Sequence, residues 1–204
     1  MRDAPVRLDV ECIGVRGDGV AHCEGERIFL PFTLPGDRVR ARLGARHGDG
    51  SDGEVLSFET QAPRAEPSCP HFCLCGGCAL QHVPPDLYAA SKLMWLRTAL
   101  ERQGLAAAPI APIRLLPPGA RRRARLTLRR TRAQIEVGFQ ARSSHRVIDL
   151  RHCAVLHSRL MALVAPLRRL AAELLAADGE ASATLTLAET GAPVYTACHA
   201  RQSR

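Results

Sequence analysis

The sequence predicts an α+β protein: a small five-stranded β-barrel, then a cysteine-rich loop, then a mixed helix and strand segment. Three observations predict this fold class. The first 60 residues hold short alternating stretches separated by turns, four cysteines fall within residues 69–78, and helical and strand patterns follow one another after residue 84. We therefore expect a barrel over residues 1–60, a linker and cysteine loop over 61–83, and an incomplete α+β domain over 84–204.

The barrel is predicted from period-two alternation of apolar and polar residues. VRLDVEC, at residues 6–12, alternates in this way, as does a strand with one buried face. The stretches VAHC, RIFLPF, RVRARL and EVLSF follow, separated by turn residues. In RVRARL the apolar side chains should face inward, while Arg38, Arg40 and Arg42 face water and are the barrel's candidates for contact with RNA. About five short strands favour closure into a barrel, because closure removes exposed sheet edges.

The remainder of the chain alternates between helical and strand patterns. TQAPRAEPS has the composition of a linker. Residues 84–104 fit a helix that ends at Gly104 and carries one apolar side, formed by Leu87, Ala90, Leu93, Leu96 and Leu100. Strands are expected over 123–130, 134–140, 145–150 and 183–189, and a helix over 158–177 that Pro166 kinks or restarts.

Composition narrows the classes of partner and compartment. The 204 residues carry a net charge of +8, with 28 basic against 20 acidic side chains, which favours an anionic partner. No apolar run is long enough to span a bilayer, and MRDAPVRLDV lacks the apolar core of a secretory signal, so we expect a cytoplasmic protein without a membrane partner. Thiols stay reduced in that compartment, so the eight cysteines favour a metal site over disulfides.

The cysteines in CPHFCLCGGCALQH have the spacing of metal ligands. Cys69, Cys75 and Cys78 form the pattern C-x5-C-x2-C, and Cys153 is a fourth thiol farther along the chain. Three clustered thiolates and one remote thiolate suit a cubane iron–sulfur cluster, in which each iron takes one sulfur ligand. The Gly-Gly pair between two ligands would let the backbone turn tightly.

Zinc is the rival interpretation of the same residues. A structural zinc site usually shows two closely spaced ligand pairs, and only Cys75 and Cys78 make such a pair here. Further ligands for zinc are available in Cys73, His71, His82 and His152. The spacing favours iron–sulfur and leaves zinc open.

The segment GARRRARLTLRR is the most basic stretch of the chain. It contains Arg121, Arg122, Arg123 and Arg125, with no acidic residue between them. Strand alternation should place Arg121, Arg123 and Arg125 on one face and Arg122 on the other. The ordinary interpretation is a solvated strand face; the alternative is contact with RNA phosphates, which relieve the repulsion between guanidinium groups.

The cysteine segment also resembles a known family. CPHFCLCGGCALQ is similar to the C-P-x-F-x-x-C-G-G-C-x-x-Q signature of the RNA uracil-C5 methyltransferases (the RumA/TrmA type) that carry a [4Fe–4S] cluster. Residues 6–58 resemble the family's TRAM domain, an OB-like RNA-binding barrel, and RRRARLTL and GFQARSSHRVIDLRHCAVL resemble its central domain. The resemblance implies cluster ligands at Cys69, Cys75, Cys78 and Cys153, and RNA, ribosomal rather than transfer RNA, as the partner.

The resemblance also implies what we do not expect in this chain. In the family, the catalytic cysteine, the base and the S-adenosylmethionine site belong to a C-terminal domain, and no segment here matches it. Neither Cys198 nor the glycine-rich turns match its motifs. We therefore assign no catalytic or S-adenosylmethionine-binding residue, and expect a truncated product with that cofactor only in a full-length form. Two alternatives stay open: a stand-alone RNA-binding metal module, and a redox or iron sensor.

Overall fold

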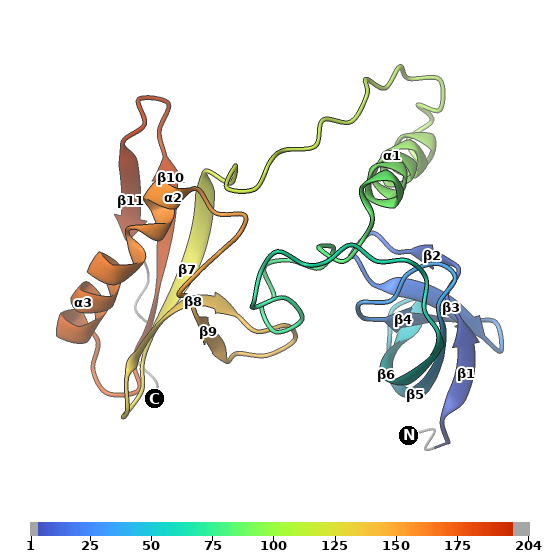
Figure 1. The fold of residues 1–204 in the computed structure, drawn as a ribbon, viewed down its shortest axis with the longest axis horizontal. Coiled ribbons are helices and arrows are strands. Elements are labelled where there is room, and N and C mark those ends of the chain that lie inside the picture. The colour runs from blue at the N-terminus through green and yellow to red at the C-terminus, as the bar shows by residue number, and fades with distance from the viewer. Residues whose placement is uncertain (1–3, 198–204) are drawn as a thin grey trace. The chain divides into compact units, whose positions relative to one another are not determined.

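A computed structural model describes residues 4–197, apart from the side chains of His47 and residues 194–197. The chain divides into two compact units (Figure 1). The first contains the chain up to Pro67 together with Ala79–Leu115. The second contains Ser68–Cys78 and the chain from Leu116 onward. Each unit has its own sheet, so the predicted α+β class is confirmed.

The first unit is built on a six-stranded sheet. Its strands are β1 (Val6–Asp9), β2 (Cys12–Ile13), β3 (Gly19–Cys23), β4 (Glu26–Leu30), β5 (Arg38–His47) and β6 (Gly50–Thr60), in the order β1-β5-β6-β4-β3-β2. All pairs are antiparallel except β4 with β6. The order begins with β1 and ends with β2, which are consecutive along the chain.

The number of strands differs from the five expected because residues 6–13 form two strands. At the break, the Val10 N–H donates to the Asp37 carbonyl at 2.9 Å, and the Glu11 N–H donates to the Val20 carbonyl at 2.9 Å. One segment therefore pairs with β5 at its start and with β3 at its end. Inside lie the buried side chains of Leu8, Val10, Ala21, Ile28, Leu30, Val39, Ala41 and Leu43.

Helix α1 (Pro85–Glu101) lies in the first unit and follows the predicted range closely. Its predicted apolar side was partly wrong: Leu87 belongs to the contact face, but not every predicted position is covered. Ala90 and Leu96 are exposed, and the helix packs through Leu87, Tyr88 and Trp95 against the small cluster around Ile13 and Leu34. The Trp95 Nε1–H donates to the Ile13 carbonyl at 2.9 Å. One directional hydrogen bond and a large ring outweigh the leucine stripe in choosing the contact face.

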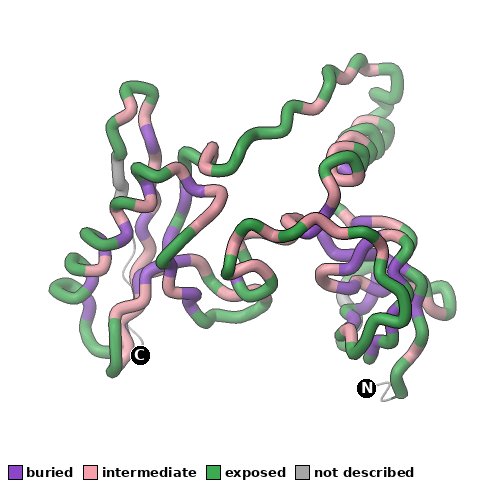
Figure 2. The backbone as a smooth tube through the Cα atoms, viewed as in Figure 1, coloured by how far each residue is buried: buried purple, intermediate pink, exposed green. Residues whose placement is uncertain are grey.

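The second unit is a five-stranded antiparallel sheet in the order β11-β10-β7-β8-β9. Its strands are β7 (Arg123–Arg130), β8 (Ile135–Gln140), β9 (Val147–Asp149), β10 (Glu180–Leu187) and β11 (Pro193–Ala197). Strand β11 was not predicted, because its five residues have no clear alternation. Figure 2 shows buried positions of β7 and β10 interleaved with exposed or half-buried ones.

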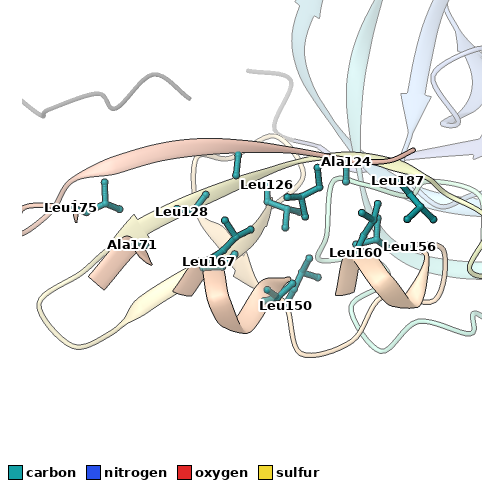
Figure 3. Packing of buried hydrophobic residues seen from close by; sticks show 14 residues of the cluster. Ala124, Leu126, Leu128, Leu150, Leu156, Leu160, Leu167, Ala171, Leu175 and Leu187 are labelled. Atoms are coloured by element: carbon teal, nitrogen blue, oxygen red, sulfur yellow. The ribbon is translucent and has the colours of Figure 1, made fainter. Parts of the chain in front are cut away.

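Helices α2 (Ser158–Met161) and α3 (Val164–Leu174) cover one face of this sheet. Figure 3 shows Leu126 and Leu128 of β7 on the same side as Leu160 and Leu167 of the helices, within one buried cluster. The helix break lies at residues 162–163 rather than at Pro166. Proline is tolerated in the first turn of α3, where no intrahelical N–H bond is lost. Within residues 4–197, no helix is long and apolar enough to cross a bilayer.

Candidate functional site

The cysteine loop is held in shape by its own backbone. The Phe72 N–H donates to the Cys69 carbonyl at 3.0 Å, and the Cys75 N–H donates to the His71 carbonyl at 2.8 Å. Cys73 has a φ of 69°, a left-handed conformation that lets the loop reverse between these two turns. The loop thus presents Cys69, Cys75 and Cys78 from a few tight turns.

The loop is also joined to the end of β8. Cys75 forms an isolated antiparallel bridge with Ala141, and the Gly76 N–H donates to the Gln140 carbonyl at 2.9 Å. A Cβ atom at Gly76 would lie 2.9 Å from that carbonyl oxygen, so glycine is required for this approach. Sequence reasoning missed Gln140 and Ala141 as supports of the loop, because a contact between two distant segments leaves no local pattern.

Cys153 lies on a segment that pairs with the start of the arginine run. The Arg121 N–H donates to the Val155 carbonyl at 2.9 Å, and the His157 N–H donates to the Arg121 carbonyl at 3.0 Å. Leu156 is buried in the second unit's core, and the partly buried Cys153 packs against that core. The fourth predicted ligand is therefore anchored beside β7.

The four predicted ligands act on one another electrostatically. Burial raises the pKa of the Cys75 thiol most, the Gly77 N–H bound to its Sγ at 3.4 Å lowers it, and the charges of Cys78, Cys153 and Cys69 raise it further. The other three predicted ligands therefore lie within electrostatic range of the Cys75 thiol. Still, in the described part of the chain, no three His, Cys, Asp or Glu side chains lie close enough to hold a metal ion.

The charge effect on Cys75 and the lack, among the described residues, of side chains at metal-binding distance are compatible with each other. Cys75 feels the charge of the other three thiols, and the loops would have to move to bring the sulfur atoms to coordination distance. Such closure is typical where metal binding and folding are coupled. The loop also contains a buried polar atom without a partner: among the described residues, the Nε2 of His71 makes no hydrogen bond.

Cys73 stands apart from the other thiols of the loop. It is exposed, and the pKa of its thiol is raised by burial of part of the group alone, with no contribution from another cysteine. Exposure thus distinguishes Cys73 from Cys75, which is buried. Cys198, which the sequence also offered, lies outside the described residues.

The arginine run leads into the start of β7, where side chains alternate between the two faces of the sheet as expected. Ala124, Leu126 and Leu128 are buried, whereas Arg123 and Arg125 are exposed on the opposite face. The Arg125 guanidinium donates to the Ser182 Oγ from Nε at 3.1 Å and from Nη2 at 2.9 Å.

The other two arginines of the predicted set have separate surroundings. Arg122 donates to the Leu187 carbonyl at 3.1 Å, so its side chain is tied to the end of β10. Arg121 precedes β7, and its backbone belongs to the pairing with residues 155–157. Its side chain is exposed.

The arginines predicted on the first unit are partly neutralised by their neighbours. Arg38 pairs with Asp9 at 2.6 Å, a hydrogen bond that raises the pKa of the guanidinium, and Arg42 pairs with Glu54 at 2.8 Å. Both partners stand on adjacent strands. Arg40 is exposed, and no ion pair is found for it within the part of the chain that the structure describes. Only Arg40 of the three therefore presents an uncompensated charge.

Comparison with known proteins shows which proteins this chain is similar to. No protein-family model matches the sequence. An RNA methyltransferase of Caulobacter vibrioides, itself uncharacterised, is 39% identical over 168 residues, covering 80% of this chain and 39% of that protein. A 23S rRNA (uracil(1939)-C(5))-methyltransferase of Acidithiobacillus ferrooxidans is 37% identical over 175 residues, covering 81% of this chain and 39% of that protein. The chain is a homologue of RNA methyltransferases.

A solved methyltransferase has a similar fold. The tRNA (uracil-54, C5)-methyltransferase of Pyrococcus abyssi, crystallised with S-adenosyl-L-homocysteine, matches with a TM-score of 0.62 at 20% identity. The match covers 97% of this chain and 46% of that one. Against the two methyltransferases matched by sequence, the chain spans about 39% of the length. The predicted relationship is thus confirmed at the coarser level: homologues of this chain are RNA uracil-C5 methyltransferases.

Proposed function

We propose that this chain is the RNA-binding and cluster-carrying portion of an S-adenosylmethionine-dependent uracil-C5 methyltransferase that modifies 23S ribosomal RNA in the cytoplasm. One observation carries the proposal: 80–81% of the chain matches proteins named as RNA methyltransferases, one of them specific for a 23S rRNA uracil. Because the chain spans about 39% of these relatives, methyl transfer and the use of S-adenosylmethionine are proposed for the longer protein.

The arginine face of β7 supports RNA as the partner. Arg123 and Arg125 stand side by side on an exposed strand face, and Arg121 is exposed next to them. An exposed row of guanidinium groups suits phosphate contacts, since each group can donate two parallel hydrogen bonds. The first unit, whose pairing order begins and ends within residues 6–13, is proposed as the TRAM-type RNA-binding domain, with Arg40 as its most available cation.

The chemistry of the donor set suits a [4Fe–4S] cluster, although the loops would have to close around it. The three other thiols contribute to the pKa of Cys75, and the Gly77 N–H donates to the Cys75 Sγ, a contact that would support a bound sulfur ligand. Cys69, Cys75, Cys78 and Cys153 would each hold one iron. When bound, the cluster supplies a cross-link between the cysteine loop and the segment that pairs with Arg121. Through this cross-link, the four cysteine ligands would hold in place the segment that pairs with Arg121, just before β7.

The metal and the partner are tested together on the purified 204-residue chain. We expect anaerobically prepared protein to contain about four iron and four sulfide per chain and to bind uridine-containing RNA. We expect no methyl incorporation from radiolabelled S-adenosylmethionine, because no catalytic residue is assigned here. One zinc per chain without iron would support the alternative of a stand-alone RNA-binding zinc module. Methylated RNA would contradict the assignment of catalysis to the longer protein.

A further inference from the structure

A polar hollow lies over the second unit's sheet, on the face that carries Arg125. It has a volume of about 570 Å³, within the range of small-ligand sites, and is lined by Arg125, Thr127, Gln140, His145, Glu180, Ala181 and Ser182. These residues come from β7, β8, β10 and the loop after β8. Since Leu126 and Leu185 on the same strands face the helices, the hollow opens on the side that the helices leave uncovered.

The lining of the hollow does not match a phosphate. A phosphate site gathers cationic and N–H donors, whereas Glu180 places a carboxylate in this hollow. The Arg125 guanidinium is held by two hydrogen bonds to Ser182, from Nε and Nη2, so that its Nη1 donors have no acceptor within the described residues. Gln140 and the hydroxyls of Thr127 and Ser182 can each donate and accept. This mixture of fixed donors and acceptors is the chemistry that reads the edge of a nucleobase.

We propose that the hollow receives one unpaired RNA base that bears an exocyclic amino group, adenine or cytosine, next to the strand of phosphates held by the arginine run. The proposal rests on the proposed function, because RNA must be the partner. Glu180 accepts from the amino group, as carboxylates do from the cytosine N4 amine. His145 supplies a ring against which the base can stack. Uracil, with a carbonyl in place of the amine, would meet the carboxylate with an unfavourable acceptor.

The position of the hollow explains how it would depend on the cysteine loop. Gln140, which lines the hollow, accepts through its carbonyl from the Gly76 N–H, and Ala141 bridges to Cys75. One wall of the base site is thus built on the segment that carries the predicted metal ligands. The arginine run and the hollow share β7, so phosphate and base contacts would be made by one strand.

The test uses the anaerobically purified chain and fluorescently labelled short homopolymers of adenylate, cytidylate and uridylate, with an abasic ribose-phosphate oligomer as the backbone probe. We expect the wild type to favour adenylate and cytidylate over uridylate. Glu180→Gln should weaken adenylate and cytidylate binding by about tenfold, the effect of one lost base-edge contact. The same variant should strengthen uridylate binding, because the glutamine amide can donate to the uracil carbonyl, and should leave abasic binding and the salt dependence unchanged relative to the control below. Glu189→Gln, an exposed glutamate outside the hollow, is the matched control.

His145→Ala is the second variant, and it should weaken all three homopolymers but not the abasic oligomer. Equal affinities of Glu180→Gln and wild type for adenylate and cytidylate would overturn the proposal. A uniform loss that includes the abasic oligomer would overturn it as well. The wild type could bind RNA with a steep salt dependence while Glu180→Gln and His145→Ala bound every probe as tightly as the wild type does. That result would reject the base site and leave the proposed RNA binding intact. If the wild type bound none of the probes, the proposed RNA function would fail with it.

Discussion

At the scale of single residues, Asp37 organises the first unit. Its side chain is fully buried and accepts from the Leu34 N–H at 2.7 Å, the Ala62 N–H at 2.8 Å and both Nη groups of Arg64, at 2.9 and 2.6 Å. Arg64 in turn lies over the Phe58 ring at 5.1 Å. The segment after β6, which by composition is a linker, is thus fixed to the sheet through one carboxylate.

Replacing Asp37 with asparagine should destabilise the first unit by about 3 kcal/mol, because Arg64 then loses its counter-charge in a largely buried position. Trp95, the one tryptophan of the chain, reports unfolding of this unit through its fluorescence in urea. Asp9→Asn, which breaks the exposed pair with Arg38, should change the midpoint far less. Equal effects of the two substitutions would show that burial of the Asp37 pair is unimportant.

The same carboxylate should shape the acid limb of stability. Burial raises the pKa of Asp37, but the Arg64 hydrogen bonds, the Leu34 and Ala62 N–H groups and the Arg64 charge outweigh burial and lower the pKa below its ordinary 3.8. A lowered pKa means that this stabilisation is complete above about pH 4 and is lost as the pH falls further. We expect Asp37→Asn to lose less stability than the wild type between pH 4 and pH 2, measured by urea unfolding. Parallel curves would contradict this assignment.

At the scale of elements, the second unit depends on contacts between segments that are distant along the chain. The cysteine loop bridges to the residues after β8, and the Cys153 segment pairs with the residues before β7. A cross-link between the loop and the Cys153 segment would close a long stretch of chain. Closing a long loop restricts the unfolded chain most, so bound metal should contribute directly to the stability of this unit.

Two cysteine substitutions distinguish a predicted cluster ligand from a cysteine that is not predicted to bind the cluster. Cys153→Ser should lower iron and sulfide content and the thermal midpoint of the second unit, followed by circular dichroism. Cys73→Ser is the matched control, because Cys73 is exposed and feels no charge from the other thiols. We expect it to keep wild-type iron. Loss of iron in Cys73→Ser with retention in Cys153→Ser would exchange the two assignments.

At the scale of the whole molecule, the net charge is +8, but some of its arginines are neutralised by nearby carboxylates and others are not. Arg38 and Arg42 are paired with carboxylates on neighbouring strands, whereas Arg123 and Arg125 are exposed without ion pairs within the described residues. Phosphates attract most strongly where positive charge is uncompensated. The exposed face of β7 should therefore dominate the salt dependence of RNA binding.

Replacing Arg121, Arg123 and Arg125 together with alanine should flatten the plot of log K against log salt. Each phosphate neutralised on a single strand contributes a slope of about −0.7, so three lost contacts reduce the slope by about 2. Fluorescence anisotropy with a uridine-rich RNA over a range of salt concentrations measures this directly.

A charge-matched control removes three other arginines. Arg97, Arg102 and Arg114 are exposed in the first unit on or after α1, and their triple alanine variant has the same net charge as the β7 variant. The control should keep the wild-type slope. If both triple variants flattened the slope equally, net charge alone would govern binding and the β7 face would have no special part.

Local patterns in the sequence account for much of this structure. Alternation over residues 38–43 and 123–130 determined which side chains are buried, because successive side chains of a strand point to opposite faces. The range of α1 followed from its helical composition and the glycine at 104. The contact face of α1 did not, since the hydrogen bond from Trp95 to Ile13 joins residues that are far apart in the chain.

The sequence by itself determined the α+β class, most of the strands and helices, and the spacing of the thiols within residues 69–78. Only the tertiary structure decided that the segment carrying Cys153 pairs with the residues before β7, and that Cys75 bridges to Ala141 after β8. It also decided that Arg38 and Arg42 are paired, and that β7, β8 and β10 together line a polar hollow. The reason is physical: periodicity is a property of neighbouring residues, whereas charge pairing and site assembly depend on which strands lie side by side.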